Sequence, residues 1–251
     1  MNTADTRRFG GISRLFGKDG FEILTHSHVT VVGVGGVGSW VAEALTRTAI
    51  GKITLIDGDT VEESNTNRQL PAINGTYGLK KVDVLASRLR AINPHAEIIA
   101  IDRFVSADNF DEIVPSCDVL IDCIDSLTAK TMLVARGKNK ADYVLTSGGA
   151  GGKCDASRVA VSDIAYAKGD SLIAAMRSRL RKEYGFPAGS ANGAKSKPFG
   201  IEAVYSDEAV LPSQDGAEGF GVFMAVTATF AMRLAQSCVL KLIDKKLRKT
   251  I

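Results

Sequence analysis

Four glycines between residues 33 and 38 form a pattern that suits the binding of phosphate groups. They are Gly33, Gly35, Gly36 and Gly38. An apolar run, 29–33, leads into them, and a stretch with helical spacing, 39–49, follows. Such a turn lets the backbone approach a phosphate chain, and the N–H groups at the helix start bind the anion. Asp57 ends the next apolar run, where a carboxylate can accept hydrogen bonds from ribose hydroxyls. The pattern predicts a nucleotide site and by itself fits NAD as well as ATP.

A dense polar segment after Asp57 favours a triphosphate over a dinucleotide. It contains Asp59, Asn65, Arg68 and Gln69, and Lys81 follows near the start of the next predicted helix. An arginine fork and an amide can clamp phosphate oxygens, and a lysine can neutralise them. A dehydrogenase has no obvious use for these side chains. Taken singly, Arg68 fits a surface ion pair and Lys81 a solvated helix residue equally well.

Asp125 is a candidate ligand for magnesium. It lies just after the apolar run 118–122, and therefore at the carboxyl edge of any parallel sheet that contains this run. A carboxylate there could hold Mg²⁺ on the phosphates of a nucleotide. The alternative is that Asp125 caps the helix predicted over 127–139.

Short apolar runs alternate with helical stretches along the first part of the chain. This order predicts an α/β fold with a doubly wound, mostly parallel sheet and helices on both faces. The predicted strands are 29–33, 52–57, 97–101, 118–122 and 143–147, with shorter ones at 158–161 and 201–205. The predicted helices are 39–49, 79–92, 127–139 and 170–184.

The order of these motifs resembles that of the ubiquitin-activating enzymes and of their bacterial relatives that adenylate sulfur-carrier proteins. It reads G-x-G-G-x-G-S, then D-x-D-x-V-x-x-S-N-x-N-R-Q, a lysine about a dozen residues on, and D-C-x-D, over roughly 9–150. The resemblance implies that residues at the positions of Arg68 and Lys81 stabilise charge while the α-phosphate of ATP is attacked. It implies an ATP site formed by Gly35, Gly36, Asp57, Asn65, Arg68, Gln69 and Lys81, with Asp125 on magnesium.

The same resemblance implies a homodimer, because in many relatives an N-terminal arginine reaches the ATP of the partner subunit. The matching position here is Gly11, so Arg8 or Arg14 would have to take that role.

The cysteines depart from the pattern of relatives that activate protein tails. Such relatives usually carry two C-x-x-C pairs for zinc, whereas Cys117, Cys123, Cys154 and Cys238 form no such pair, so no zinc is expected. Cys154 is the one cysteine in a setting that suggests exposure, and its neighbour Lys153 could lower its pKa. A nucleophilic role and an incidental one both stay open for Cys154.

The start of the chain and the turn 149–153 resemble a narrower group, the bacterial tRNA threonylcarbamoyladenosine dehydratases, over the whole length. The resemblance implies a tRNA substrate whose modified adenosine, next to the anticodon, carries a carboxylate that ATP activates. The neighbouring carbamoyl amide then closes a ring with loss of water. A sulfur-acceptor protein of a cysteine desulfurase system is a further implied partner. The alternative function is adenylation of the C-terminal carboxylate of a small sulfur-carrier or ubiquitin-like protein.

A basic helix and a loop concentrate positive charge in the second half of the chain. The candidates for RNA binding are Arg177, Arg179, Arg181, Lys182, Lys195 and Lys197. Together with a mobile loop at 185–200 they could follow RNA phosphates. An ordinary solvated helix face explains the same residues equally well.

The composition indicates a folded protein without strong preference for a partner. The chain has 251 residues, a net charge of +3 and 45% hydrophobic residues. Its first residues lack the apolar core of a signal peptide, so a cytoplasmic location is expected. The most apolar stretch, 220–243, is interrupted by Arg233 and is expected to be a buried core or dimer helix. A membrane-associated stretch is the alternative.

We therefore expect three parts: an N-terminal helical arm over 1–28, a Rossmann-like ATP-binding domain over 29–167, and a C-terminal part over 168–251. The last part would hold the basic helix, the loop and the apolar helix, packed on the same domain.

Overall fold

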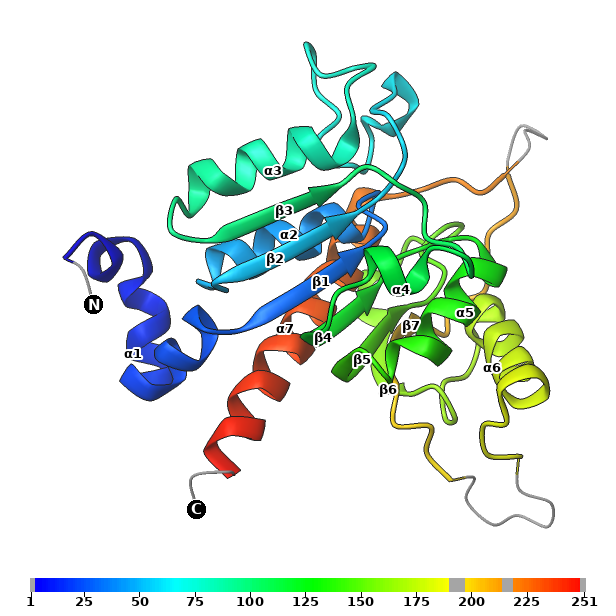
Figure 1. The fold of residues 1–251 in the computed structure, drawn as a ribbon. Helices are drawn as coiled ribbons and strands as arrows, with labels where there is room; N and C mark the ends of the chain where they lie inside the picture. The colour runs from blue at the N-terminus through cyan, green and yellow to red at the C-terminus, as the bar shows by residue number, and fades with distance from the viewer. Residues whose placement is uncertain (1–2, 190–196, 214–218, 249–251) are drawn as a thin grey trace.

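A seven-stranded sheet forms the centre of the protein (Figure 1). The computed structural model describes residues 3–189, 197–213 and 219–248. The strands are β1 (His28–Val32), β2 (Lys52–Ile56), β3 (Glu97–Ile101), β4 (Cys117–Asp122), β5 (Ala141–Ser147), β6 (Val159–Asp163) and β7 (Glu202–Ser206). Their order is β3-β2-β1-β4-β5-β7-β6, and only the β6–β7 pairing within the described sheet is antiparallel. The predicted doubly wound, mostly parallel sheet is confirmed.

Helices cover both faces of this sheet (Figure 1). The helices on these faces are α2 (Gly38–Arg47), α3 (Lys81–Ile92), α4 (Phe110–Ile113), α5 (Leu127–Gly137), α6 (Ser171–Tyr184) and α7 (Met224–Arg248). The remaining helix, α1 (Thr3–Thr25), lies beyond the amino end of β1 (Figure 1). One core cluster joins the sheet to apolar residues of α2, α3 and α7, and a second joins it to those of α4, α5 and α6. The central strands are buried on both faces, which explains why they read as continuous apolar runs.

The apolar C-terminal stretch forms α7, which belongs to the core. Phe230, Leu234 and Cys238 are fully buried against the sheet and α2. Among the described residues, Met224–Asp244 alone is long and apolar enough to cross a membrane, and half of it is buried inside the fold. Since a buried core helix passes the same test, this length and composition are weak evidence for a membrane span.

Two features of the fold were not predicted from the sequence. The antiparallel pairing of β6 with β7 was not predicted, because register between distant segments leaves no local pattern. The short helix α4 was also missed, since four residues are too few to show helical periodicity. Lys195, in the loop predicted to be mobile, lies outside the described residues.

A buried ion pair joins three elements at the carboxyl end of the sheet. The ammonium Nζ of Lys130 on α5 lies 2.6 Å from Oδ2 of Asp122 at the end of β4, and both side chains are fully buried. Thr146 of β5 donates its hydroxyl to the same oxygen at 2.6 Å, and the backbone N–H of Ile124 donates to Oδ1 at 3.0 Å. Burial raises the pKa of the Asp122 carboxyl, while Lys130 and these hydrogen bonds oppose that rise.

We predict that Asp122→Asn lowers the free energy of unfolding by about 3–5 kcal/mol, because it leaves the buried ammonium of Lys130 without a counter-charge. Urea unfolding followed by circular dichroism measures the change. The matched control is Asp111→Asn, which removes a surface partner of Arg136 and should cost less than about 1 kcal/mol. Equal unfolding midpoints for the two variants would contradict a structural role for the buried pair.

Candidate functional site

A cavity of about 900 Å³ lies where the loops at the carboxyl ends of the strands converge. The strand order reverses between β1 and β4, and crevices at such a reversal are the usual ligand sites of doubly wound sheets. The lining comes from the loops after β1, β2, β3, β4 and β5, from the start of α6 and from the segment before α7. The fold therefore brings segments that lie more than a hundred residues apart in the sequence to one cavity.

The glycine turn after β1 requires glycine at positions 33 and 38, where a side chain would clash with neighbouring backbone. Gly33 has a φ of +83°, and a Cβ on Gly38 would lie 1.8 Å from the carbonyl oxygen of Gly33. Asp57 fixes the turn from β2, because its Oδ2 accepts the backbone N–H of Val34 at 2.7 Å. Its Oδ1 accepts the N–H of Asp59 at 2.9 Å. The carboxylate is thus held at the cavity with further lone pairs left to accept hydrogen bonds.

Arg68 and Gln69 lie over the glycine turn. A Cβ on Gly36 would meet the Cγ of Arg68 at 3.4 Å, and one on Gly35 would meet the amide of Gln69 at 3.7 Å. Arg68 donates to the Ser64 carbonyl and to Oδ1 of Asn67, each at 2.9 Å. The side-chain oxygen of Gln69 is buried and has no hydrogen-bond partner among the described residues. A buried amide oxygen without a partner costs free energy, and the Gln69 atom nearest the glycine turn is the side-chain nitrogen Nε2.

Asn65 stabilises the loop that carries Arg68 and Gln69, and its side-chain oxygen is already engaged within that loop. Its side chain is buried, and its Oδ1 accepts the backbone N–H of Glu62 at 3.2 Å. Its carbonyl oxygen accepts the N–H groups of Arg68 and Gln69. The side chain therefore shapes the short 3₁₀ turn Glu63–Asn65 from which Arg68 and Gln69 follow.

Lys81 and Asp59 form a pair inside the predicted site. The ammonium Nζ of Lys81 lies 2.9 Å from Oδ2 of Asp59, and the lysine side chain is only 7% exposed, whereas that of Asp59 is 55% exposed. Both residues line the cavity. The sequence predicted each as a separate ligand of a nucleotide, and the structure shows the aspartate holding the lysine.

Asp125 is exposed and lines the same cavity. The described residues contain no cluster of three or more His, Cys, Asp or Glu side chains able to hold a metal ion alone. Magnesium on a nucleotide needs only one or two carboxylates, because phosphate oxygens and waters complete its six ligands. A single carboxylate at this edge is therefore compatible with that ion.

Lys153 and Asp170 are cavity residues that the sequence interpretation missed. Lys153 is buried and donates to the Ser206 carbonyl at 2.8 Å and to Oδ2 of Asp170 at 3.3 Å. Asp170 also accepts the N–H of Gly149 at 3.0 Å and caps α6 through the N–H of Ile173. Its place just before a helix was the one local signal that could have found it.

The expected effect of Lys153 on Cys154 is wrong. The ammonium of Lys153 pairs with Asp170, while the exposed Cys154 donates its thiol to Oε1 of Glu208 at 3.2 Å. This hydrogen bond and the negative charge of Glu208 raise the pKa of the thiol. Cys154 also lies outside the cavity lining, and its raised pKa does not favour a nucleophilic role.

The basic residues of α6 lie outside the cavity and are partly engaged in the fold. Arg177 donates to the carbonyls of Ile164 and Ala167, and burial lowers its pKa. Arg179 bonds Thr128. Arg181 bonds the Pro187 carbonyl and lies over the Phe199 ring. Lys182 and Lys197 are exposed, so among the described candidates they offer the most accessible charge.

We predict slow alkylation of Cys154 by iodoacetamide at mildly alkaline pH, because its raised pKa leaves little thiolate. Glu208→Gln removes the negative charge, lowers the thiol pKa and should speed the reaction. Peptide mass spectrometry measures the rate, and the buried Cys238 serves as the unreactive reference in folded protein. Fast alkylation that Glu208→Gln leaves unchanged would show that Glu208 does not control this thiol.

The chain is similar to known proteins over nearly its whole length. The sequence profile of the ThiF family matches residues 11–250. The tRNA threonylcarbamoyladenosine dehydratase of Haemophilus influenzae is 40% identical, over 96% of this chain and 95% of that protein. The crystal structure of the Escherichia coli tRNA N6-threonylcarbamoyladenosine dehydratase, TcdA, in complex with ATP has a TM-score of 0.89 at 39% identity, covering 98% of each chain. The same enzyme in complex with AMP has a TM-score of 0.90 at 40% identity and the same coverage. The chain therefore belongs to the ThiF family, and within it to the tRNA threonylcarbamoyladenosine dehydratases.

Proposed function

We propose that this protein uses ATP to activate the carboxylate of threonylcarbamoyladenosine in tRNA, after which the nucleoside closes a ring with net loss of water. The observation that carries the proposal is the position of the Arg68 side chain and the Gln69 side-chain amide over the glycine turn. The dehydratases with nearly full-length similarity, one of them in complex with ATP, support it.

The chemistry assigns a task to each side chain around the cavity. The backbone N–H groups after Gly33 would hold the phosphates of ATP, and Asp57 would accept hydrogen bonds from its ribose. A carboxylate oxygen of the tRNA nucleoside attacks the α-phosphorus, and pyrophosphate leaves. Arg68 and Lys81 would stabilise the negative charge that grows on the phosphate oxygens in this step.

Ring closure then requires little from the protein. The carbamoyl amide attacks the activated carbonyl carbon and loses its proton, and AMP departs with one oxygen of the former carboxylate. The net change in the nucleoside is the loss of one water. No enzyme nucleophile takes part, which agrees with the raised pKa of the Cys154 thiol.

Magnesium would be held by Asp125 together with the phosphates, as the exposed carboxylate at the cavity allows. Its contribution would be to neutralise phosphate charge. The remaining side chains act by binding and orientation.

We further propose a cytoplasmic homodimer with tRNA as substrate and a sulfur-acceptor protein as an additional partner. Arg8 and Arg14 are both exposed, but Arg8 donates to the Ile92 carbonyl of its own chain, which favours Arg14 as the arginine that reaches the partner's ATP. The chain would then consist of an arm over 1–28, a Rossmann-like ATP-binding domain over 29–167 and a C-terminal part over 168–251.

The first test is a reaction with ATP, magnesium and tRNA that carries threonylcarbamoyladenosine. Nucleosides from the digested tRNA should include one lighter by a water, and Arg68→Ala should reduce its rate by roughly 10²–10³-fold, since one charge-stabilising donor is lost. The matched control is Arg47→Ala, an arginine on the surface of α2.

The nucleotide products identify the activation step. AMP with pyrophosphate supports attack on the α-phosphorus, whereas ADP with phosphate would show phosphorylation of the carboxylate. An unchanged nucleoside despite ATP binding would contradict the proposal, and pyrophosphate exchange stimulated by a sulfur-carrier protein would then favour the alternative function.

Asp125→Asn should raise the magnesium concentration needed for half-maximal activity by roughly 10- to 150-fold, because an ionic contact worth about 1.5–3 kcal/mol is lost. Activity is measured over a magnesium series at fixed ATP, with Asp108→Asn as an exposed control outside the cavity. Identical magnesium curves for wild type and Asp125→Asn would rule out this carboxylate as the ligand.

A further inference from the structure

The segment just before α7 forms one wall of the cavity and is tied to both of its neighbours. Phe220 and Val222 line the cavity. The N–H of Gly152 donates to the Gly221 carbonyl at 2.7 Å, and the side-chain amide of Asn67 donates to the Val222 carbonyl at 3.1 Å. The wall is therefore fixed on one side to the turn after β5 and on the other to the loop that carries Arg68.

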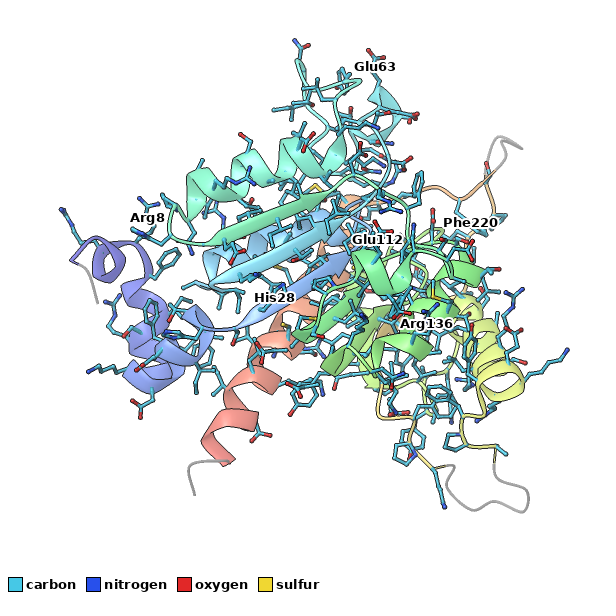
Figure 2. The ribbon with its side chains drawn as sticks, viewed as in Figure 1. Arg8, His28, Glu63, Glu112, Arg136 and Phe220 are labelled. Carbon is cyan, nitrogen blue, oxygen red and sulfur yellow. The ribbon has the colours of Figure 1, made fainter. Side chains whose placement is uncertain are left out.

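Phe220 is unusually exposed for a phenylalanine in a cavity wall. Its exposed fraction is 66%, although phenylalanine is among the residues most often buried. Figure 2 labels Phe220 on the segment that leads to α7. Its ring lies against the backbone of Gly151, where an added Cβ would come within 3.0 Å of the Cβ of Phe220 and 3.6 Å of its ring. The Phe220 side chain thus packs against Gly151 on one side, while much of its surface stays exposed to solvent.

Two aliphatic side chains extend the apolar surface next to this ring. Val210 lines the cavity and is 41% exposed, and Leu211 is 48% exposed. Their position is fixed because the N–H of Leu211 donates to the Gly152 carbonyl at 2.7 Å. The same turn after β5 therefore supports an aromatic face and an aliphatic edge together.

The proposed reaction needs places for two adenosines, one from ATP and one from the tRNA. Asp57, assigned above to the ribose of ATP, lies at the end of β2, and Phe104 packs beside the neighbouring Gly58. Phe220 belongs to a different part of the lining, next to the turn after β5. Its segment is hydrogen-bonded to the loop that carries Arg68. A base held at Phe220 would leave its attached carboxylate close to the residues that act on the α-phosphate.

We infer that Phe220 stacks on a nucleobase of the tRNA substrate and so positions the modified nucleoside for attack on ATP. The inference rests on the proposed function. Proteins read single-stranded RNA loops by stacking unpaired bases on aromatic rings, which present a flat π-face at little cost in side-chain freedom. Phe220 is a positioning residue for the RNA, with no part in binding ATP.

The test compares Phe220→Leu, which keeps an apolar side chain but removes the ring, with Phe220→Trp, which restores an aromatic face. We expect Phe220→Leu to reduce kcat/KM for the modified tRNA by roughly 5- to 150-fold, mainly through KM, as loss of one stacked base implies. ATP affinity and the melting temperature should stay at wild-type values, and Phe220→Trp should recover most of the activity.

Phe223→Leu is the matched control. Phe223 lies on the same segment and is 53% exposed, but it does not belong to the cavity lining. Its replacement should leave kcat/KM for tRNA close to that of the wild type. A loss as large as that of Phe220→Leu would overturn the inference, because it would assign the effect to the segment as a whole.

Fluorescence supplies a direct reading. The chain has one tryptophan, Trp40, so the wild type gives the background for Phe220→Trp. An anticodon stem-loop with the modified adenosine should quench the added indole.

The inference is overturned if quenching is absent, or if Phe220→Leu keeps wild-type kcat/KM, or loses ATP binding. In each case the wild type would still dehydrate tRNA, whereas an inactive wild type would instead refute the proposed function.

Discussion

The pairing of Asp122 with Lys130 underlies the cavity, because one buried carboxylate fixes the ends of two strands and the start of a helix. Asp122 holds α5 through Lys130, β5 through Thr146 and the loop that leads to Asp125 through the N–H of Ile124. Beyond Thr146 the chain enters the glycine-rich turn that supports Phe220. A buried charge is stable only when it is paired and hydrogen-bonded. The strand ends that carry these partners are therefore fixed, and so are the positions from which the cavity loops begin.

Aspartates repeat this arrangement around the cavity. Asp57 fixes the glycine turn, Asp59 holds Lys81, and Asp170 joins Lys153, the turn after β5 and α6. In each case a carboxylate accepts hydrogen bonds from backbone N–H groups or a lysine of another segment. Charge-assisted hydrogen bonds therefore help to hold the loops at the carboxyl end of the sheet.

Much of the fold and one half of the cavity could be predicted from the sequence, for a physical reason. Strand runs such as 97–101 and the glycine turn are local patterns, and the order of Arg68, Gln69 and Lys81 follows a known motif. The other half depends on contacts between distant segments. Lys153 finds its partners at Asp170 and Ser206, and Cys154 finds Glu208, so adjacency in sequence assigned the lysine to the wrong group. Phe220 was missed because an aromatic residue in a glycine-rich loop has no periodicity to show which way it faces.

The contact between Lys81 and Asp59 bears on how tightly a nucleotide could bind. A free lysine side chain loses about 1.5–2 kcal/mol of rotamer entropy when it is ordered. In this protein the ammonium is already held at 2.9 Å on a carboxylate, and the alkyl chain is almost wholly buried. The entropy cost of ordering the Lys81 side chain is therefore part of the free energy of folding. An anion that binds in the cavity meets an ammonium group that is already ordered, which lowers the entropy cost of binding.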